Sequence, residues 1–580
     1  MRRICGVVVG ALCVCCGSLV PASGQSCVSV TTYHNDNFRT AQNLAETVLT
    51  PTNLGSVTEL FATHPLLDGW SVAQPLYLPQ TTINGAVHNV VFVATLANSM
   101  YAFDADSGVE YWRVTYGPPD SVPFQNGYCT DTGFAQNPSH GAGIVGTPVI
   151  DMSISPPAIY FVTKEFDGTT HSLKLHAVDS SSGNELTGSP TVMQGSVVNH
   201  AGTTITFSAE FQMSRPAMLL SNGIIYVGIG SVGCKEFPNY GWVMSYTFSA
   251  ENGFLQQGVF NTAPDLANPA GTGPYGNGGI WEGGGGLAAD ASGNIYFATA
   301  DANNFYLNAK GWQGTDFGDS IVQLTPSLGA PASSANYFTP YNDRALYTGD
   351  LDLASTGVVL LPDQPGTYPH ILVGYGKAEE IYVINRDNMG GYTGPKGPNN
   401  ILQDVVNPTT GACTTGGVTF TQCADLKGTC GWNAPAYWNN NLYFSGNPGP
   451  LMSYVWTPGA TAPLAACPTI EGGFAAKTYN ASGSPSTSSN GASGGLMWVV
   501  TWPGTRLATL RAFDATNLGS QLFAASVGSV GSYPTPTIAN GTVYVATKGR
   551  LYAFGMKGVS GCKGSGKAAN KSDGVVALRR

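Results

Sequence analysis

The chain has 580 residues, of which only 10% are charged and 75 are glycine. Soluble domains usually carry about 25% charged residues, so this composition favours an extracytoplasmic all-β protein in which glycine serves many tight turns. The formal net charge of −10 offers no attraction to nucleic acid or to an anionic membrane, and we exclude both as expected partners.

The first 24 residues are expected to be a secretion signal. Arg2 and Arg3 precede an apolar core over residues 4–20, and cleavage among the small residues that follow would leave Gln25 as the first residue. No later segment is long and apolar enough to predict a membrane span. We therefore expect a mature protein that is secreted or periplasmic.

Three further segments follow the expected signal. Residues 25–60 form an entry segment, residues 61–555 carry repeated strands, and residues 556–580 are a Gly- and Lys-rich tail that we expect to be disordered. Within the repeats, residues 480–495 are rich in Ser and Gly and predict a flexible loop.

Two kinds of strand recur along the repeats. The first is a run of β-forming residues that contains an aromatic residue in most copies. It occurs eight times, at residues 90–95, 158–162, 223–228, 293–299, 371–374, 441–444, 497–500 and 542–547. In most copies the second kind leads into a turn of Asp, Asn or Ser followed by Gly, which supplies side-chain caps and positive φ. Its copies cover residues 100–108, 175–183, 381–390, 510–519 and 551–555.

Small sheets repeated at irregular spacing, with almost no amphipathic-helix pattern between them, predict a β-propeller, whose radial closure leaves few exposed strand edges. Two β-sandwich domains are the alternative, which is less favoured because sandwich strands need not share a turn signature. The last repeat is one strand short. We therefore expect the entry segment to supply the missing outer strand and to close the ring.

Eight cysteines remain once the expected signal is removed. An even number in a secreted chain predicts disulfides, although their pairing cannot be read from spacing. Cys413, Cys423 and Cys430 are expected to staple one long loop, and a metal site there is the less favoured alternative because the chain has no C-x-x-C pair at these positions. The eight are Cys27, Cys129, Cys234, Cys413, Cys423, Cys430, Cys467 and Cys562.

One repeat carries a family resemblance. The turn from Ala102 to Gly108, followed by Trp112, resembles the A-x-D-x-x-T-G-x-x-x-W tryptophan-docking motif of the quinoprotein alcohol dehydrogenases. The entry segment around Tyr33 and Arg39 is similar to the N-terminal pattern of the same family. The resemblance covers nearly the whole mature chain and implies an eight-bladed propeller, a fold that in this family binds pyrroloquinoline quinone (PQQ) and calcium.

Five local matches carry the site that this resemblance implies. Glu236 matches a calcium-ligand Glu that also belongs to the cofactor site, and Asp301 replaces an Asn that binds calcium, which a carboxylate can also do. Trp281 matches the residue on which the quinone stacks, and Lys377 matches the cation that contacts the quinone carbonyls. Asp352 stands where the family has its catalytic base.

The chain also departs from the family pattern. The mature chain lacks the adjacent cysteine pair that usually caps the quinone, and Leu351 and Leu353 replace aromatic residues beside Asp352. No C-x-x-C-H haem motif is present, so an enzyme would need a separate electron acceptor. Each site residue also has a structural interpretation. Glu236 and Lys377 would be surface charges, Asp301 a turn cap, Trp281 a space filler and Asp352 part of a half-buried strand.

The sequence leaves open whether the protein is an enzyme. One hypothesis is a PQQ- and calcium-dependent dehydrogenase of an alcohol or a sugar. The alternative is a non-catalytic propeller that binds a polymer or a partner protein through exposed aromatic side chains, for which the candidates are Tyr275, Trp312, Tyr341 and Trp456. An outer-membrane assembly scaffold is less favoured because such scaffolds are normally lipid-anchored and no lipobox is visible.

Overall fold

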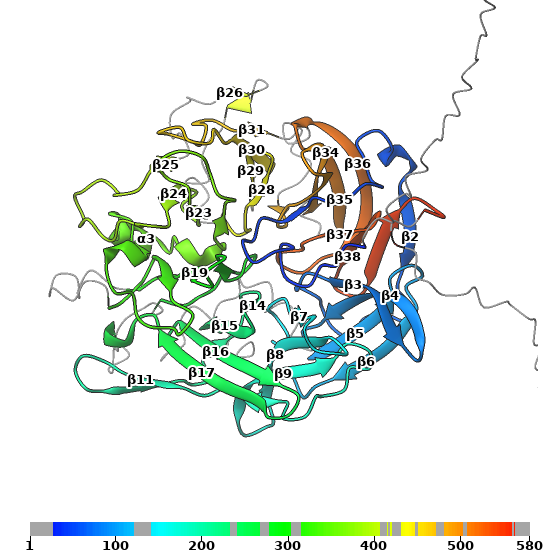
Figure 1. The fold of residues 1–580 in the computed structure, drawn as a ribbon, viewed down its shortest axis with the longest axis horizontal. Helices are drawn as coiled ribbons and strands as arrows, with labels where there is room; N and C mark the ends of the chain where they lie inside the picture. The colour runs from blue at the N-terminus through cyan, green and yellow to red at the C-terminus, as the bar shows by residue number, and fades with distance from the viewer. Residues whose placement is uncertain are drawn as a thin grey trace, which may run out of the picture.

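The strands of the computed structural model form an eight-bladed β-propeller (Figure 1). The structure describes residues 27–120, 141–232, 240–266, 278–302, 315–405, 414–415, 418–419, 431–446, 451–470, 481–502, 507–559 and 562. Within these ranges each blade is built on four antiparallel strands, which follow one another along the chain in every blade but the eighth, so the predicted fold class is confirmed.

The first four blades follow one another along the first half of the chain. Blade one contains β3 (Leu76–Ile83), β4 (Ala86–Ala94), β5 (Ser99–Asp104) and β6 (Glu110–Thr115). Blade two contains β7 (Val149–Asp151), β8 (Ala158–Phe166), β9 (His171–Asp179) and β10 (Thr191–Val192). Blade three contains β14 (Leu219–Ser221), β15 (Ile224–Ser231), β16 (Trp242–Ser249), β17 (Gly253–Asn261) and the added β13 (Gln212–Met213). Blade four contains β18 (Ala288–Ala289), β19 (Ile295–Ala298), β20 (Ile321–Leu324) and β21 (Tyr337–Phe338).

The last four blades continue in the same order. Blade five contains β22 (Val359–Leu360), β23 (Ile371–Tyr375), β24 (Ile381–Asn385) and β25 (Gln403–Val405). Blade six contains β28 (Ala436–Trp438), β29 (Asn441–Ser445), β30 (Leu451–Val455) and β31 (Thr469–Ile470). Blade seven contains β33 (Ser486–Asn490), β34 (Ser493–Trp502), β35 (Leu507–Asp514), β36 (Asn517–Ser529) and the added β1 (Gln42–Asn43) and β32 (Ala481–Ser482). Blade eight contains β37 (Thr537–Ala539), β38 (Thr542–Ala546), β39 (Leu551–Gly555) and β2 (Thr58–Ala62).

Short elements connect the blades. They are the hairpins β11 (Ser196–Val198) with β12 (Thr204–Thr206) and β26 (Thr414–Thr415) with β27 (Val418–Thr419), the helix α3 (Asp343–Gly349), and the 3-10 turns η1 (Leu54–Ser56), η2 (Pro264–Leu266), η3 (Ser334–Asn336) and η4 (Leu353–Ser355). Among the described residues, no helix is long and apolar enough to cross a membrane.

The two recurring strands of the sequence are the second and third strands of the blades. All eight aromatic-rich runs fall on a second strand, from β4 in blade one to β38 in blade eight, and the turn-bearing runs fall on third strands such as β5 and β9. These central strands are buried on both faces, since neighbouring blades cover them. Burial on both faces explains why they read as continuous apolar runs.

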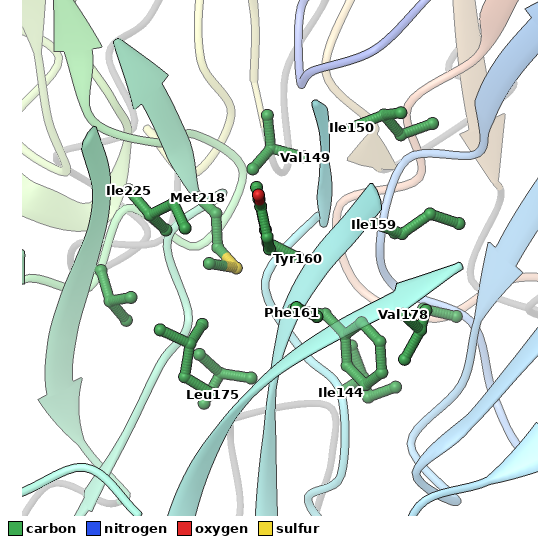
Figure 2. Packing of buried hydrophobic residues seen from close by; sticks show 14 of the residues in the cluster. Ile144, Val149, Ile150, Ile159, Tyr160, Phe161, Leu175, Val178, Met218 and Ile225 are labelled. Atoms are coloured by element: carbon green, nitrogen blue, oxygen red, sulfur yellow. The ribbon is translucent and has the colours of Figure 1, made fainter. Parts of the chain in front are cut away.

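The hydrophobic core lies between neighbouring blades. Figure 2 shows this packing around blade two, where Tyr160 of β8 points toward Met218, which lies next to β14 of blade three. The side chains of this layer are fully buried, and their removal from water is the main favourable contribution to blade packing.

The turn after β5 shows how one blade docks on the next. The Asp104 carboxylate accepts hydrogen bonds from the backbone N–H groups of Asp106 and Ser107, at 3.1 and 2.7 Å, and Gly108 has a positive φ of 75°. Trp112 follows on β6, and its Nε1 donates to the Ser180 carbonyl of blade two at 3.2 Å. The tryptophan therefore docks blade one on the equivalent turn of blade two.

Residues 30–43, which we call the belt, run through the centre of the ring (Figure 1). The belt bonds the innermost strand of every blade in chain order. Its partners are Tyr77, Ile150, Leu220, Ala289, Leu360, Tyr437, Thr487 and Ile538, which lie on β3, β7, β14, β18, β22, β28, β33 and β37. A single segment thus satisfies inward-facing backbone groups that would otherwise lack a strand partner.

Both ends of the described chain meet in blade eight. The entry segment continues into β2, which pairs antiparallel with β39 as the outer strand of this blade. The β2 strand ends at Ala62 and so straddles the boundary at residue 60 that the sequence suggested. A disulfide joins Cys27 to Cys562, which are 535 residues apart. The expected signal over residues 1–24, the end of the tail and the cysteines 413, 423 and 430 lie outside the described residues.

The predicted flexible loop over residues 480–495 is wrong, because β32, β33 and the start of β34 occupy most of its described residues. Ser486–Asn490 forms β33, the innermost strand of blade seven, and four of its five residues are buried. The hydroxyls bond across blades: Ser486 Oγ donates to the Pro536 carbonyl at 2.9 Å, and Ser489 Oγ accepts from Trp438 Nε1 at 2.8 Å. The small polar side chains of this strand therefore tie blade seven to blades six and eight through hydroxyl hydrogen bonds.

Candidate functional site

Charged side chains gather on the face of the propeller where chain segments lead into the innermost strands. Asp301 follows β19 and Asp319 precedes β20, so both lie in one connection of blade four. Asp352 comes just before η4 on the way into blade five, and Lys377 lies between β23 and β24 of that blade. Residues far apart in sequence therefore meet near the propeller axis.

Asp301, Asp319 and Asp352 form what we call the aspartate cluster. One carboxylate oxygen of each lies within 4.8 Å of those of the other two. The backbone N–H of Asp301 donates to Asp352 Oδ1 at 3.2 Å, and the N–H of Leu353 donates to Asp319 Oδ1 at 3.1 Å. Asp301 Oδ1 and Asp319 Oδ2 are buried, and neither has a hydrogen-bond partner in the structure as described.

The pKa values in this cluster diverge for physical reasons. Burial, together with the neighbouring carboxylates, raises the pKa of Asp301 and of Asp319. Burial also opposes ionisation of Asp352, but the ion pair with Lys377 outweighs it and lowers the Asp352 pKa. A bound cation is what would let all three carboxylates ionise together.

Lys377 is held between two aspartates. Its Nζ contacts the Asp352 carboxylate and lies 2.9 Å from Asp350 Oδ1. Only 7% of the lysine is exposed, whereas Asp350 is 64% exposed. Burial alone would lower the lysine pKa, but the two carboxylates prevail and raise it. Lys377 is therefore a fixed positive charge at the edge of the cluster.

A row of aromatic rings and cations faces the cluster, and we call it the aromatic row. The Arg215 guanidinium carbon lies 4.4 Å from the centre of the Trp281 ring and 5.7 Å from that of Tyr533. Tyr533 stacks on Trp432 with ring centroids 6.4 Å apart, and Lys377 Nζ lies 4.9 Å from the Trp432 ring centre. The two groups of residues give the site an acidic side and a cationic, aromatic side.

A glycine-rich segment closes the axis beneath the site. The Gly284 carbonyl accepts hydrogen bonds from the Tyr33 hydroxyl of the belt, from Ala434 N and from Ser484 Oγ, the last two at 3.0 Å. A Cβ on Gly285 would lie 2.5 Å from Gly357 N, so a larger residue cannot cross here. The belt therefore lies beneath the aspartate cluster and the aromatic row, and we call this region at the axis the funnel.

Glu282 connects the funnel to the belt. Its side chain is fully buried, and Oε1 accepts a hydrogen bond from Ala298 N at 3.0 Å. Burial raises the pKa of Glu282 to about 8, although this hydrogen bond and the nearby Arg39 oppose the rise. Arg39 is itself buried and donates to the Leu287, Tyr33 and Met218 carbonyls and to Thr32 Oγ1 at 2.7–3.0 Å.

Replacing Glu282 by glutamine is expected to flatten the pH dependence of stability. A carboxyl whose pKa is higher in the folded chain favours the folded state at low pH. The wild-type free energy of unfolding should therefore fall as the pH rises from about 4.5 to about 8. The variant lacks this loss and should be the more stable protein above that range. Thermal unfolding across the range, with Glu59→Gln as an exposed control, measures the effect, and parallel curves would contradict it.

Four of the five residues singled out by sequence lie in this funnel. Asp352 contacts both Asp301 and Lys377. The segment that carries Trp281 is bonded to the segment of Asp301, because Gly278 N donates to the Asp301 carbonyl at 2.8 Å. Glu236 lies outside the described residues. These placements describe position, and the roles of the residues stay predictions.

Sequence reasoning missed Asp319, Arg215, Trp432 and Tyr533. The β19–β20 register, in which Ala298 pairs with Ile321, places Asp319 opposite Ala300 and so next to Asp301, and recognising that hairpin would have found it. Arg215, Trp432 and Tyr533 each precede an innermost strand of a different blade, and no sequence pattern links them.

The aromatic side chains proposed as polymer contacts differ in their exposure to solvent. Tyr341 is exposed, as that hypothesis requires. Trp456 is buried, and its Nε1 donates to Gln364 Oε1 at 2.9 Å, so its assignment as a surface contact is wrong. The ring fills blade six instead. Tyr275 and Trp312 lie outside the described residues.

Three solved structures to which this chain is similar are quinoprotein or methanol dehydrogenases. A quinohemoprotein alcohol dehydrogenase from Comamonas testosteroni shares 14% identity with a TM-score of 0.57, covering 93% of this chain and 82% of its own. The quinohemoprotein alcohol dehydrogenase ADHIIG from Pseudomonas putida HK5 shares 14% identity with a TM-score of 0.55, and the match covers 93% of this chain and 82% of that protein. A europium-containing methanol dehydrogenase shares 14% identity with a TM-score of 0.51, and the match covers 91% of this chain and 98% of that protein.

No protein-family model and no curated protein sequence matches the chain. The structural likeness nevertheless shows that the protein has the eight-bladed propeller fold of the quinoprotein alcohol dehydrogenases.

Proposed function

We propose that the protein is a cation- and PQQ-dependent dehydrogenase that oxidises an alcohol or a sugar outside the cytoplasm. The observation that carries this proposal is the aspartate cluster, with Lys377 bound to it, beside Trp281 on the axis of a quinoprotein-type propeller. Three structural neighbours are alcohol or methanol dehydrogenases. The Cys27–Cys562 disulfide is consistent with an oxidising compartment.

The donor set suits a hard cation such as calcium. Hard cations bind carboxylate oxygens, and the cluster offers three carboxylates, of which Asp301 Oδ1 and Asp319 Oδ2 are buried without a hydrogen-bond partner in the described structure. Asp301 and Asp319 would be the principal ligands, while Asp352 would be shared between the cation and Lys377. The family resemblance adds Glu236 as a further candidate ligand.

The aromatic row has the chemistry that a planar anion requires. Trp281, Trp432 and Tyr533 supply flat rings, and Arg215 and Lys377 supply positive charge. Arg215 already lies over the Trp281 ring, so PQQ could stack there only if that guanidinium moved. Bound in the funnel, PQQ would supply the two-electron acceptor for the oxidation.

The chain's own residues would handle the proton and the charge. Asp352 has a lowered pKa and is ionised at neutral pH, so it can accept the proton of a substrate hydroxyl. A base of low pKa suffices because a neighbouring cation makes the hydroxyl more acidic. Lys377 keeps Asp352 oriented and places a fixed positive charge where negative charge develops.

Dye-linked oxidation of alcohols and sugars by the mature protein, supplied with PQQ and calcium, tests the proposal. Asp352→Asn is expected to lower kcat by about 10²-fold or more, the scale of a lost general base. Asp350→Asn is the matched comparison, because Asp350 pairs with the same lysine but is largely exposed. We expect a change of only about threefold there. Equal losses in the two variants, or no PQQ-dependent turnover in the wild type, would contradict the proposal.

A non-catalytic propeller that binds a polymer or a partner protein is the second candidate. One observation favours it: Arg215 covers a face of Trp281, the ring on which the resemblance places the quinone. In that case the rings and cations of the aromatic row would contact the bound ligand directly. Cation-dependent binding of a polymer or a partner protein, together with no turnover in the oxidation assay above, would support this candidate.

A further inference from the structure

We infer that Arg215 is a specificity-determining residue of the funnel, because its guanidinium occupies a ring face of Trp281 and must be displaced before a flat ligand can stack there. The inference rests on the proposed function for the identity of that flat ligand, PQQ. It concerns the chain's own side chains, and it holds or fails on whether that ring face becomes available when Arg215 is shortened.

Arg215 lies between two rings. Its guanidinium carbon is 4.4 Å from the Trp281 ring centre and 5.7 Å from that of Tyr533, and Nη2 lies within hydrogen-bond distance of the Tyr533 hydroxyl, at 3.3 Å. Aromatic groups stack with centroids about 4.5–7 Å apart. The guanidinium therefore fills the shell that a stacked ligand ring would need.

The backbone around Trp281 is held in place, and Arg215 is packed against it. The residues on both sides of Trp281 are tied by backbone hydrogen bonds, from Ile280 N to Ile229 O at 3.3 Å and from Glu282 N to Ala354 O at 2.7 Å. On the floor, a Cβ on Gly283 would lie 3.1 Å from Arg215 Nη2 and 2.9 Å from the Tyr533 ring. Arg215 is itself only 3% exposed. A flat ligand that stacks on the ring face next to Arg215 must therefore displace the guanidinium.

Occupancy and charge attraction make opposite predictions for substitutions of Arg215. If the guanidinium blocks the ring face, shortening the side chain should increase the affinity for a planar anion. If it mainly attracts the anion, shortening should reduce the affinity, and lysine should restore it. Burial between two rings favours the first case, since the guanidinium lies against aromatic faces that a stacked ligand would need.

PQQ titration of the full mature protein in excess calcium distinguishes the two cases. The protein is labelled with 5-fluorotryptophan, and the Trp281 resonance is identified by its loss in Trp281→Phe. We expect Arg215→Ala to shift the Trp281 resonance before any ligand is added and to lower the Kd for PQQ by about tenfold or more relative to wild type, with Arg215→Lys between the two. Arg215→Ser takes the place of the alanine variant if that variant does not fold.

Three results would overturn the inference. They are an unshifted Trp281 resonance in Arg215→Ala, weaker PQQ binding by this variant than by wild type, and no PQQ binding by either protein, since an uncovered ring face should accept the quinone. The proposed dehydrogenase fails separately. Tight PQQ binding by Arg215→Ala without alcohol oxidation supports the role of Arg215 and contradicts the enzyme. Turnover by the wild type, together with weaker PQQ binding by Arg215→Ala, supports the enzyme and contradicts the role of Arg215.

Discussion

Calcium is expected to stabilise the chelator-treated wild-type protein by about 2–3 kcal/mol at a concentration a hundredfold above its Kd, and Asp319→Asn or Asp301→Asn is expected to remove most of that gain. The reason is the aspartate cluster, whose three carboxylates lie within 4.8 Å of one another and include two buried oxygens without a hydrogen-bond partner in the described structure. A cation would offset their repulsion and supply the missing partner. The measurement is thermal unfolding with chelator and with added calcium.

The change in unfolding temperature that Asp301→Asn or Asp319→Asn causes in chelator distinguishes a metal site from general destabilisation. Without a cation, burial and mutual repulsion raise the pKa values of Asp301 and Asp319, so a neutral amide at either position should leave the unfolding temperature unchanged or raise it. The exposed Glu59→Gln should keep the full response to calcium. A variant that unfolds earlier in chelator, or one that keeps the calcium response, would contradict the cation site. A trivalent lanthanide is a useful second probe, since one structural neighbour contains europium.

Arg39→Met is expected to lower the free energy of unfolding by about 3–5 kcal/mol, the usual loss when a buried ionic group is removed from its partners. Arg39 is 1% exposed and donates to acceptors on the belt, to Met218 beside blade three and to Leu287 beside blade four. Its loss leaves several buried carbonyls without a donor. Arg39→Lys should recover only part of the stability because an ammonium cannot reproduce the planar arrangement of donors.

The comparison for Arg39 is an arginine outside the belt. Arg113 is exposed on β6 and lies over the Tyr101 ring with its guanidinium carbon 5.7 Å from the ring centre. Arg113→Met should change stability by less than about 1 kcal/mol. Chemical and thermal unfolding of the two variants provide the measurement. A similar loss in both would show that the belt does not hold the blades together as its hydrogen bonds indicate.

The central strands of the blades could be predicted because their physical demands are local. A strand buried on both faces needs an uninterrupted apolar run, as in β23 and β38, and the turn after a third strand needs a capping Asp and a Gly, as at Asp104 and Gly108. The innermost strand β33 could not be predicted from these rules. Its Ser-rich sequence forms hydroxyl bonds to other blades, and no local pattern reveals those partners.

The candidate site was predictable only in part. Motifs on separate blades pointed to Asp301, Asp352 and Lys377, and the structure brings them together near the axis. Asp319 escaped notice because it reaches the cluster through the pairing of β19 with β20. The position of Arg215 over Trp281 depends on two segments that lead into different blades, and no spacing along the chain encodes it.

By itself the sequence determined the all-β class, the eight copies of the second strand of each blade and the residue types available for a site, because side-chain burial and turn geometry act over a few neighbouring residues. Only the tertiary structure decided which of those residues meet. Ring closure by β2 and β39 and the course of the belt bring the loops of different blades to one axis. The meeting of these loops gives the aspartate cluster its interacting charges and places a guanidinium on the ring where the family resemblance expects a quinone.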